Sequence, residues 1–240
     1  MALPSWFRGL LTPFIGPPGN PWDPYWPDFY KQYMKLGHHH APPQSLLHEV
    51  PVVVLDIEST GLDIRRDRIL SLGALRVLGN SIILGDKLEA YLPTPSHLST
   101  PESIRIHGII PNSQRYTYTT EPQLVEELLE YLGNAIIVGH HIGFDIAMLN
   151  AALNRLGAGP LRNQVIDTAE LAKRLRPAGY WSPKNDYSLD ALAKRYRIPL
   201  SDRHTALGDC YITAVLWLKL LTRLGNKAER YLKVEDVLVR

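Results

Sequence analysis

From residue 51 onward, hydrophobic and polar residues follow the pattern of an α/β domain. The run Pro51-Val52-Val53-Val54-Leu55 contains the β-branched residues that are typical of a buried strand. Residues 69–78 and 81–92 follow as two more extended segments, and Gly79-Asn80 between them is typical of a tight turn. The sequence therefore predicts three strands, of which the second and third form a hairpin.

The rest of the chain alternates between helical and extended patterns. Apolar residues recur with helical spacing in several segments, and short apolar runs between them are typical of buried strands. A hairpin followed by such alternation predicts a mixed β-sheet flanked by helices, which is an α/β fold. The expected strands are residues 135–138 and 165–166, and the expected helices are residues 123–132, 144–156, 168–175, 189–196, 205–224 and 227–238.

Residues 1–49 differ in composition and are predicted to form an N-terminal extension, with the α/β domain at residues 50–240. The extension holds nine of the 19 prolines and nine of the 21 aromatic residues. Helical spacing of apolar residues predicts one helix within residues 3–14 and another over residues 27–36, stopped by Gly37. We expect these aromatic side chains to pack on the chain's own domain. A partner protein or a membrane surface is the alternative.

Composition and charge restrict the class of protein. Of 240 residues, 45% are hydrophobic and 21% are charged, which excludes a wholly disordered or fibrous protein. The net charge of +2 is too small to identify a nucleic-acid-binding protein by itself. The single cysteine, Cys210, excludes an internal disulfide framework. The sequence shows neither a secretory signal nor an apolar run long enough to span a bilayer, so we expect a soluble cytoplasmic protein.

Two acidic residues end the first predicted strand, in the segment Asp56-Ile57-Glu58. Side chains two residues apart on a strand point the same way. Both carboxylates therefore project from one face at the carboxyl end of the strand, where α/β proteins place their sites. Burying such a pair without a cation is costly. The alternative is that the strand frays into an exposed loop where both acids are solvated.

Two later segments carry further acids and histidines. Residues 139–145 open a helix directly after a predicted strand, and Asp145 there is either a site residue or a residue that stabilises the helix N-terminus. Residues 203–209 lead into the long helix. Five helical residues turn through about 500°, so His204 and Asp209 reach one cleft only if His204 lies on the preceding loop and Asp209 in the first turns.

The combination of these residues indicates metal-assisted chemistry at a phosphate. Four carboxylates without a thiolate cluster select Mg²⁺ or Mn²⁺ rather than zinc. Two such ions, about 3.5–4 Å apart, clamp a phosphate during in-line displacement. A histidine is a suitable base for the attacking water, because its ordinary pKa is near neutrality. The candidate ligands are Asp56, Glu58, Asp145 and Asp209, and the candidate base is His204.

The three segments resemble the exonuclease motifs of the DEDD superfamily. These are Asp56-Ile57-Glu58-Ser59-Thr60-Gly61, residues 140–145 and residues 204–209, and the histidine five residues before the last aspartate is similar to that of the DEDDh branch. The branch includes proofreading subunits of bacterial replicative polymerases, RNase T and oligoribonuclease. The resemblance covers residues 51 to about 224. It implies an RNase H-like fold and a 3′–5′ exonuclease with two Mg²⁺ or Mn²⁺ ions that releases 5′-mononucleotides from single-stranded ends.

The resemblance also implies a role for each residue. Asp56 bridges both ions, the other three acids complete the ligand set, and His204 deprotonates the attacking water. His141 stands where the family more often has asparagine, and Phe144 resembles an aromatic residue that lines the substrate pocket. The implied substrate contacts are Ser59, Thr60, Gly61, Leu62, His107, His141 and Phe144.

Basic residues are concentrated in two places. Residues 170–197 carry seven of them, with Tyr180 and Trp181 among them. This stretch either binds the phosphate backbone and stacks on bases or is an ordinary solvated face. Arg65, Arg66 and Arg68 follow the first motif and form a second candidate surface for nucleic acid.

The resemblance and the composition also lead to expectations about substrate and partner. We favour DNA over RNA as substrate, because the surroundings of the first motif are more similar to those of proofreading subunits. A protein partner, if one binds, is expected at residues 1–49. Asp167 and Asp190 are expected to be turn or cap residues outside the metal site. The alternative function is a non-catalytic nucleic-acid-binding or scaffolding protein on the same fold, which a missing metal ligand would favour.

Overall fold

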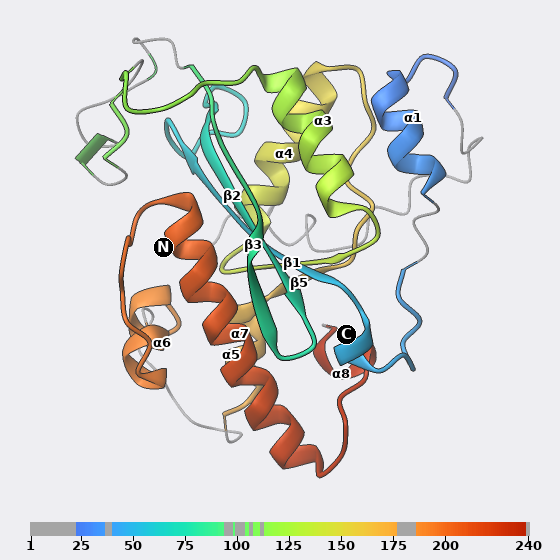
Figure 1. Ribbon diagram of the computed structural model, residues 1–240, viewed down its shortest axis with the longest axis vertical. Coiled ribbons are helices and arrows are strands. Elements are labelled where there is room, and N and C mark those ends of the chain that lie inside the picture. The colour runs from blue at the N-terminus through green and yellow to red at the C-terminus, as the bar shows by residue number, and fades with distance from the viewer. Residues whose placement is uncertain are drawn as a thin grey trace.

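A five-stranded mixed sheet forms the centre of the molecule. The computed structural model describes residues 23–36, 40–93, 98, 104–105, 108–110, 113–176 and 186–238. The strands lie in the order β3 (Ser81–Tyr91), β2 (Ile69–Leu78), β1 (Val52–Ser59), β4 (Ile136–Gly139) and β5 (Val165–Asp167) (Figure 1). β1 pairs antiparallel with β2 and parallel with β4, so the predicted mixed sheet is confirmed.

Helices cover both faces of this sheet. One face packs on α1 (Asp28–Lys35), α3 (Glu121–Leu132) and α4 (Gly143–Arg155). The other face packs on α5 (Thr168–Arg174), α6 (Leu189–Tyr196), α7 (Ala206–Ala228) and α8 (Val234–Val237) (Figure 1). The apolar run at the start of β1 is buried on both faces, because Val53 and Leu55 join the first core and Val52 and Val54 join the second. Among the described residues, no helix combines the length and apolar character needed to cross a membrane.

β1 includes the acidic segment, as predicted, and ends at Ser59. Asp56 pairs with Gly73 and Glu58 pairs with Ser71 on β2. Both acids therefore belong to a regular strand, and the alternative of a frayed, solvated loop is wrong. The two side chains lie on the face of β1 that carries Val52 and Val54, which is the α7 face.

The short helix predicted near residues 227–238 is present, but it is shorter than expected and begins later. α7 continues to Ala228, and Glu229 then ends it in the left-handed conformation with φ 54°. Only Val234–Val237 forms a helix after that, as α8. The apolar residues at the end of the chain do bury a face, since Val234 and Val237 are in the second core, but a turn separates them from α7.

The helix predicted at residues 27–36 is present as α1, and its aromatic face packs on the domain. Tyr30 and Tyr33 are fully buried. Tyr30 Oη donates a hydrogen bond of 2.7 Å to the Pro160 carbonyl, and Tyr33 Oη donates one of 2.7 Å to Asn163 Oδ1. The helix predicted within residues 3–14 and Gly37 lie outside the described residues, and the boundary at residue 49 stays a prediction.

α7 crosses the sheet at unusually short range because β2 has a glycine at the crossing. A Cβ atom on Gly73 would lie 2.6 Å from both the Ala206 carbonyl carbon and the Leu207 nitrogen. The Cys210 thiol, which is fully buried, donates a hydrogen bond of 3.0 Å to the Gly73 carbonyl. The first turn of α7 is thus held against β2, next to the carboxyl end of β1.

We expect Gly73→Ala to lower the free energy of unfolding by about 1–3 kcal/mol, because the added methyl group overpacks the crossing. Urea unfolding measures this difference. Gly85→Ala on β3 is the matched control, since a Cβ there meets nothing within 4 Å. That variant should stay within about 0.5 kcal/mol of the parent. Equal losses in the two variants would contradict the close approach of α7.

Candidate active site

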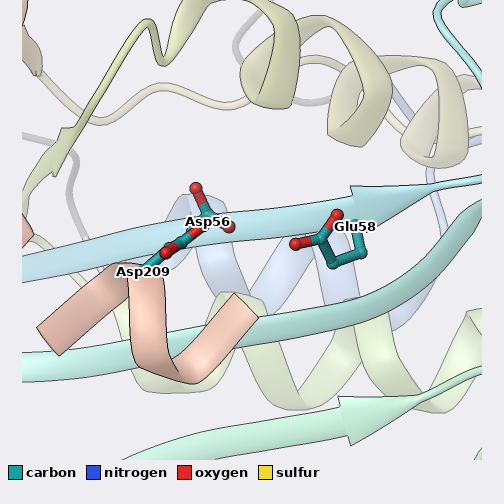
Figure 2. Close-up of side chains that lie close together, drawn as sticks. All are labelled: Asp56, Glu58 and Asp209. Atoms are coloured by element: carbon teal, nitrogen blue, oxygen red, sulfur yellow. The ribbon is translucent and has the colours of Figure 1, made fainter. Parts of the chain in front are cut away.

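Three carboxylates from two distant parts of the chain meet at the end of β1. Asp56 and Glu58 project from the strand, and Asp209 lies in the first turn of α7. One carboxylate oxygen of each residue lies within 4.8 Å of the others. Figure 2 shows the three side chains in the space between the strand and the helix. The structure therefore brings together three of the four residues predicted as metal ligands.

The loop before α7 positions both Asp209 and His204. Thr205 caps the helix, with its Oγ1 accepting a hydrogen bond of 3.1 Å from Gly208 N. A Cβ on Gly208 would lie 2.1 Å from the Asp202 carbonyl oxygen, so the loop folds tightly under the helix. His204 lies on this loop with φ 67° and is exposed. The predicted placement of His204 on the loop and Asp209 in the first turn is confirmed.

Asp145, the fourth predicted ligand, borders this group. It is buried in the first turn of α4, and its Oδ1 accepts a hydrogen bond of 3.0 Å from Ile57 N. Asp145 does not cap α4, since its N-cap residue is Ile142 and no side chain caps that end. The bond to Ile57 places Asp145 beside Asp56, outside the three carboxylates that converge.

Positive charge from the chain compensates only part of the negative charge of the acids. Burial, with a smaller contribution from the Asp209 carboxylate, raises the pKa of Glu58 to about 7, although Arg203 acts in the opposite direction. Burial also raises the pKa of Asp56 well above its ordinary range, and the Asp145 carboxylate adds to this shift. A group of ionised acids held in this environment repels itself, so the folded state favours either protons or a cation there.

The donor set fits a hard divalent cation. Asp209 Oδ1 is buried and has no hydrogen-bond partner among the described residues. An orphaned carboxylate oxygen is costly to bury, and a metal ion removes that cost. All three converging groups are carboxylates, which are the ligands that Mg²⁺ and Mn²⁺ prefer.

Arg203 is one of two site residues whose role was not predicted from the sequence. Its guanidinium forms an ion pair with Asp209, and its Nε donates a hydrogen bond of 2.8 Å to Asp190 Oδ1. Asp190 is therefore not a cap residue. Ser188 caps α6 instead, and Asp190 pairs with Arg203. Its position directly before His204 in the sequence was the one signal that could have indicated a role for Arg203 at the site.

The turn after β1 is held by Asp67, which the sequence analysis also missed. Thr60 is buried and donates a hydrogen bond of 2.7 Å from its Oγ1 to Asp67 Oδ1. Ser59 Oγ donates one of 2.7 Å to the Gly61 carbonyl. A Cβ on Gly61 would lie 2.6 Å from Asp67 Oδ2. Both hydroxyls thus stabilise the turn, while Leu62 at its tip is 83% exposed.

The remaining predicted substrate contacts lie at the start of α4 or outside the described residues. His141 is exposed with φ 56°, and its N–H donates to Asp167 Oδ1 at 3.2 Å. Asp167 also caps α5, so its predicted cap role is confirmed. Phe144 is half-buried and packs against the α3–α4 core. His107 lies outside the described residues.

Three of the six described basic residues in the 170–197 stretch, Arg174, Arg176 and Arg195, form contacts within the fold. Arg176 and Arg195 both pair with Asp186. Arg174 donates hydrogen bonds to backbone carbonyls of residues 236–238. These contacts favour the interpretation as an ordinary charged face for this part of the stretch.

The other basic surface is more accessible. Arg65 and Arg66 are exposed beside Leu62, whereas Arg68 donates to the carbonyls of Arg66 and Asp67. Tyr180 and Trp181 lie outside the described residues.

Comparisons with known proteins agree with this geometry. A family model described as exonuclease (RNase_T) matches residues 53–216. DNA polymerase III PolC-type of Staphylococcus aureus is 31% identical over 217 residues, covering 84% of this chain and 14% of that protein. The chain thus spans a small part of these curated relatives.

Solved structures match the fold at lower identity. E. coli Exonuclease I in complex with a dT13 oligonucleotide has a TM-score of 0.65 and 23% identity, covering 75% of this chain and 43% of that one. The ExoI/SSB-Ct complex has a TM-score of 0.62 and 24% identity, covering 73% and 42%. The predicted exonuclease-type α/β fold is confirmed.

The raised pKa of Glu58 predicts how stability depends on pH. The folded-state value of about 7 exceeds the ordinary value of 4.5, so the folded protein holds this proton more tightly than the unfolded chain. The metal-free protein therefore loses stability as the pH rises through this window. Because Mn²⁺ needs the ionised carboxylates, we expect its stabilising effect on the melting temperature to grow over the same window.

Thermal unfolding at about pH 5 and about pH 8, with and without Mn²⁺, measures both trends. Glu58→Gln should raise the metal-free melting temperature at the higher pH and reduce the Mn²⁺ effect. The control is Glu126→Gln, an exposed residue on α3. A Mn²⁺ effect that is absent, or that is equal at the two pH values, would count against a clustered metal site.

Proposed function

The chain belongs to the DEDD 3′–5′ exonuclease family, and on this premise we propose that it removes 5′-mononucleotides from the 3′ ends of single-stranded nucleic acid with two Mg²⁺ or Mn²⁺ ions. The observation that carries the proposal is the convergence of Asp56, Glu58 and Asp209 within 4.8 Å at the carboxyl end of the central strand. Asp56 and Glu58 are partly buried and Asp209 is buried, so cations would relieve the repulsion among these acids. Paired divalent cations are suited to phosphodiester hydrolysis.

In this proposal, the metal ligands are the four acids of the sequence motifs. Asp56, Glu58 and Asp209 hold the ions together, and Asp145 completes the set from its position beside Asp56. When held by these acids, divalent ions would supply activation of a water molecule and stabilisation of negative charge on the phosphate. The protein supports them by fixing Asp209 through the short α7 crossing at Gly73 and Asp145 through the Ile57 amide.

His204 is the proposed general base. It is exposed on the loop that leads to Asp209, so it is accessible to a water molecule at the site. The other histidine of the motifs that is a possible base, His140 in the segment 140–145, is unsuited to the role. Its Nδ1 contacts Thr168 Oγ1 at 2.9 Å, and burial lowers its pKa to about 3. A group that resists protonation to this extent is a poor proton acceptor near neutral pH.

The 3′-terminal nucleotide is proposed to bind between the turn after β1 and the start of α4. Leu62 is exposed at the tip of that turn and offers an apolar contact for a base. Phe144 offers a second surface from α4, and His141 a polar group. Ser59, Thr60, Gly61 and His107 complete the proposed contacts, with the two hydroxyls acting through the shape of the turn.

We propose DNA as the preferred substrate. The curated relative at 31% identity is a DNA polymerase, and the matching Exonuclease I structure contains a dT13 oligonucleotide. The proposed partner surface is the N-terminal extension, residues 1–49. Within it, α1 already buries Tyr30 and Tyr33 against the domain, so other residues of the extension are the candidates. The cytoplasmic location stays a prediction.

A non-catalytic nucleic-acid-binding or scaffolding protein is the alternative function. Such a protein does not need clustered carboxylates, nor a buried carboxylate oxygen such as Asp209 Oδ1, which has no hydrogen-bond partner in the described part of the chain. The assay below separates the two, because a binding protein leaves the oligonucleotide intact.

With Mn²⁺ or Mg²⁺, the protein should shorten a 5′-labelled single-stranded DNA from its 3′ end and release a mononucleotide from a 3′-labelled one. Excess EDTA should stop both reactions. Asp56→Asn is the control for contaminating nuclease. A matched RNA oligonucleotide tests the preference for DNA. Full-length substrate after long incubation with Mn²⁺ would exclude the exonuclease proposal.

His204→Ala should lower kcat by about 10²–10⁴-fold, because a positioned general base contributes this much. The Mn²⁺-induced rise in melting temperature should persist, since His204 is proposed as a base and not as a ligand. His48→Ala is the control, because His48 packs against Tyr231 away from the site. A His204 variant that turns over at the parent rate would remove this role.

A further inference from the structure

Arg203 links a carboxylate of the site to one outside it. Its guanidinium pairs with Asp209, one of the three converging acids. The same guanidinium pairs with Asp190 on α6, which is not part of that group. The Arg203 and Asp209 side chains are 22% and 7% exposed, whereas Asp190 is 54% exposed, so Asp190 is the partner on the solvent side.

The two ion pairs use different nitrogens. Nε of Arg203 donates to Asp190 Oδ1 at 2.8 Å, and Nη2 lies 3.5 Å from Asp190 Oδ2. The contact with Asp209 Oδ2 comes from Nη1. Arg203 is therefore able to release Asp209 and keep a two-pronged contact with Asp190, so the release does not leave an unpaired charge.

A metal ion at Asp209 competes with this guanidinium. Arg203 holds Asp209 Oδ2, while Oδ1 is buried without a hydrogen-bond partner among the described residues. A divalent cation that binds Asp209 meets the positive charge of Arg203 at short range, and two cations in such a site repel each other. The guanidinium supplies part of the charge that the acids need when no ion is bound.

Building on the proposed function, we propose that Arg203 is an internal counter-ion of the site, which a divalent ion displaces from Asp209 and which Asp190 then holds. Metal binding is thus an exchange of one cation for another. Arg203 lowers the metal affinity, because the ion must break its bond to Asp209. Asp190 raises the metal affinity although it is not a ligand, because it stabilises the displaced guanidinium.

The test is a titration with Mn²⁺ alone, followed by isothermal titration calorimetry, on the full chain. Arg203→Gln should bind Mn²⁺ more tightly, by roughly 5- to 150-fold, the usual range of coupling between interacting sites. Asp190→Asn should bind more weakly, since Arg203 then has no alternative partner. A general loss of stability would lower the Mn²⁺ affinity of both variants, so changes of affinity in opposite directions would not be explained by it.

The double variant separates exchange from simple charge effects. If Asp190 acts only through Arg203, Asp190→Asn should leave the affinity of the Arg203→Gln protein unchanged. If Asp190 acts only as a remote negative charge, the Asp190→Asn substitution should weaken Mn²⁺ binding by the same factor in the parent and in the Arg203→Gln protein. That result would overturn the proposed exchange.

The chain offers a matched control pair. Arg230 and Asp236 form an Arg–Asp ion pair at the other end of α7. Arg230→Gln and Asp236→Asn should leave the Mn²⁺ affinity unchanged. Where Arg203→Gln does not fold, Arg203→Lys keeps the charge but is unable to hold both carboxylates at once, and it should also bind Mn²⁺ more tightly than the parent.

The outcomes distinguish this inference from the proposed function. A parent protein that does not bind Mn²⁺ would overturn both. A parent protein that binds Mn²⁺, with an Arg203→Gln variant that binds equally or more weakly, would overturn the exchange alone and leave the exonuclease proposal standing.

Discussion

The site depends on one close approach, the crossing of α7 over β2 at Gly73. Any side chain at that position would collide with the backbone of Ala206 and Leu207. The bond from the Cys210 thiol to the Gly73 carbonyl holds the crossing at short range. Asp209 immediately precedes Cys210, so the same crossing brings its carboxylate to the end of β1. A backbone contact in the core thus decides whether acids far apart in sequence share one site.

Charge then determines how this site behaves. The helix crossing and the strand force the acids together, and burial raises the pKa of Glu58 and of Asp56. A protein without a function for these groups would gain stability by losing them. Their grouping at the end of β1 and the start of α7 has an electrostatic cost that a bound cation would offset. Arg203 offsets part of it in the absence of metal, because it is a cation that the chain itself provides.

Hydrophobic periodicity predicted the fold well, because burial leaves a local pattern. β2 and α6 have the predicted bounds, and Gly79-Asn80 marks the end of β2 in the sequence. The two-residue spacing of a strand also predicted the shared face of Asp56 and Glu58. The pairing of Arg203 with Asp190 left no such pattern, since it joins a loop to a helix through side chains alone. Asp67 also acts through a side-chain hydrogen bond, to Thr60, and such a bond leaves no periodic pattern in the sequence.

The distribution of basic residues bears on how such a site meets its substrate. Arg176 and Arg195 are engaged with Asp186, so a stretch that is rich in positive charge presents less of it to a polyanion than its composition suggests. Arg65 and Arg66 are exposed beside the turn that carries Leu62. Contacts with the phosphates along a nucleic-acid strand dominate binding affinity when a protein offers many basic side chains. Arg65 and Arg66 belong to the loop that follows β1, so these exposed basic side chains are carried by the same segment as two carboxylates of the site.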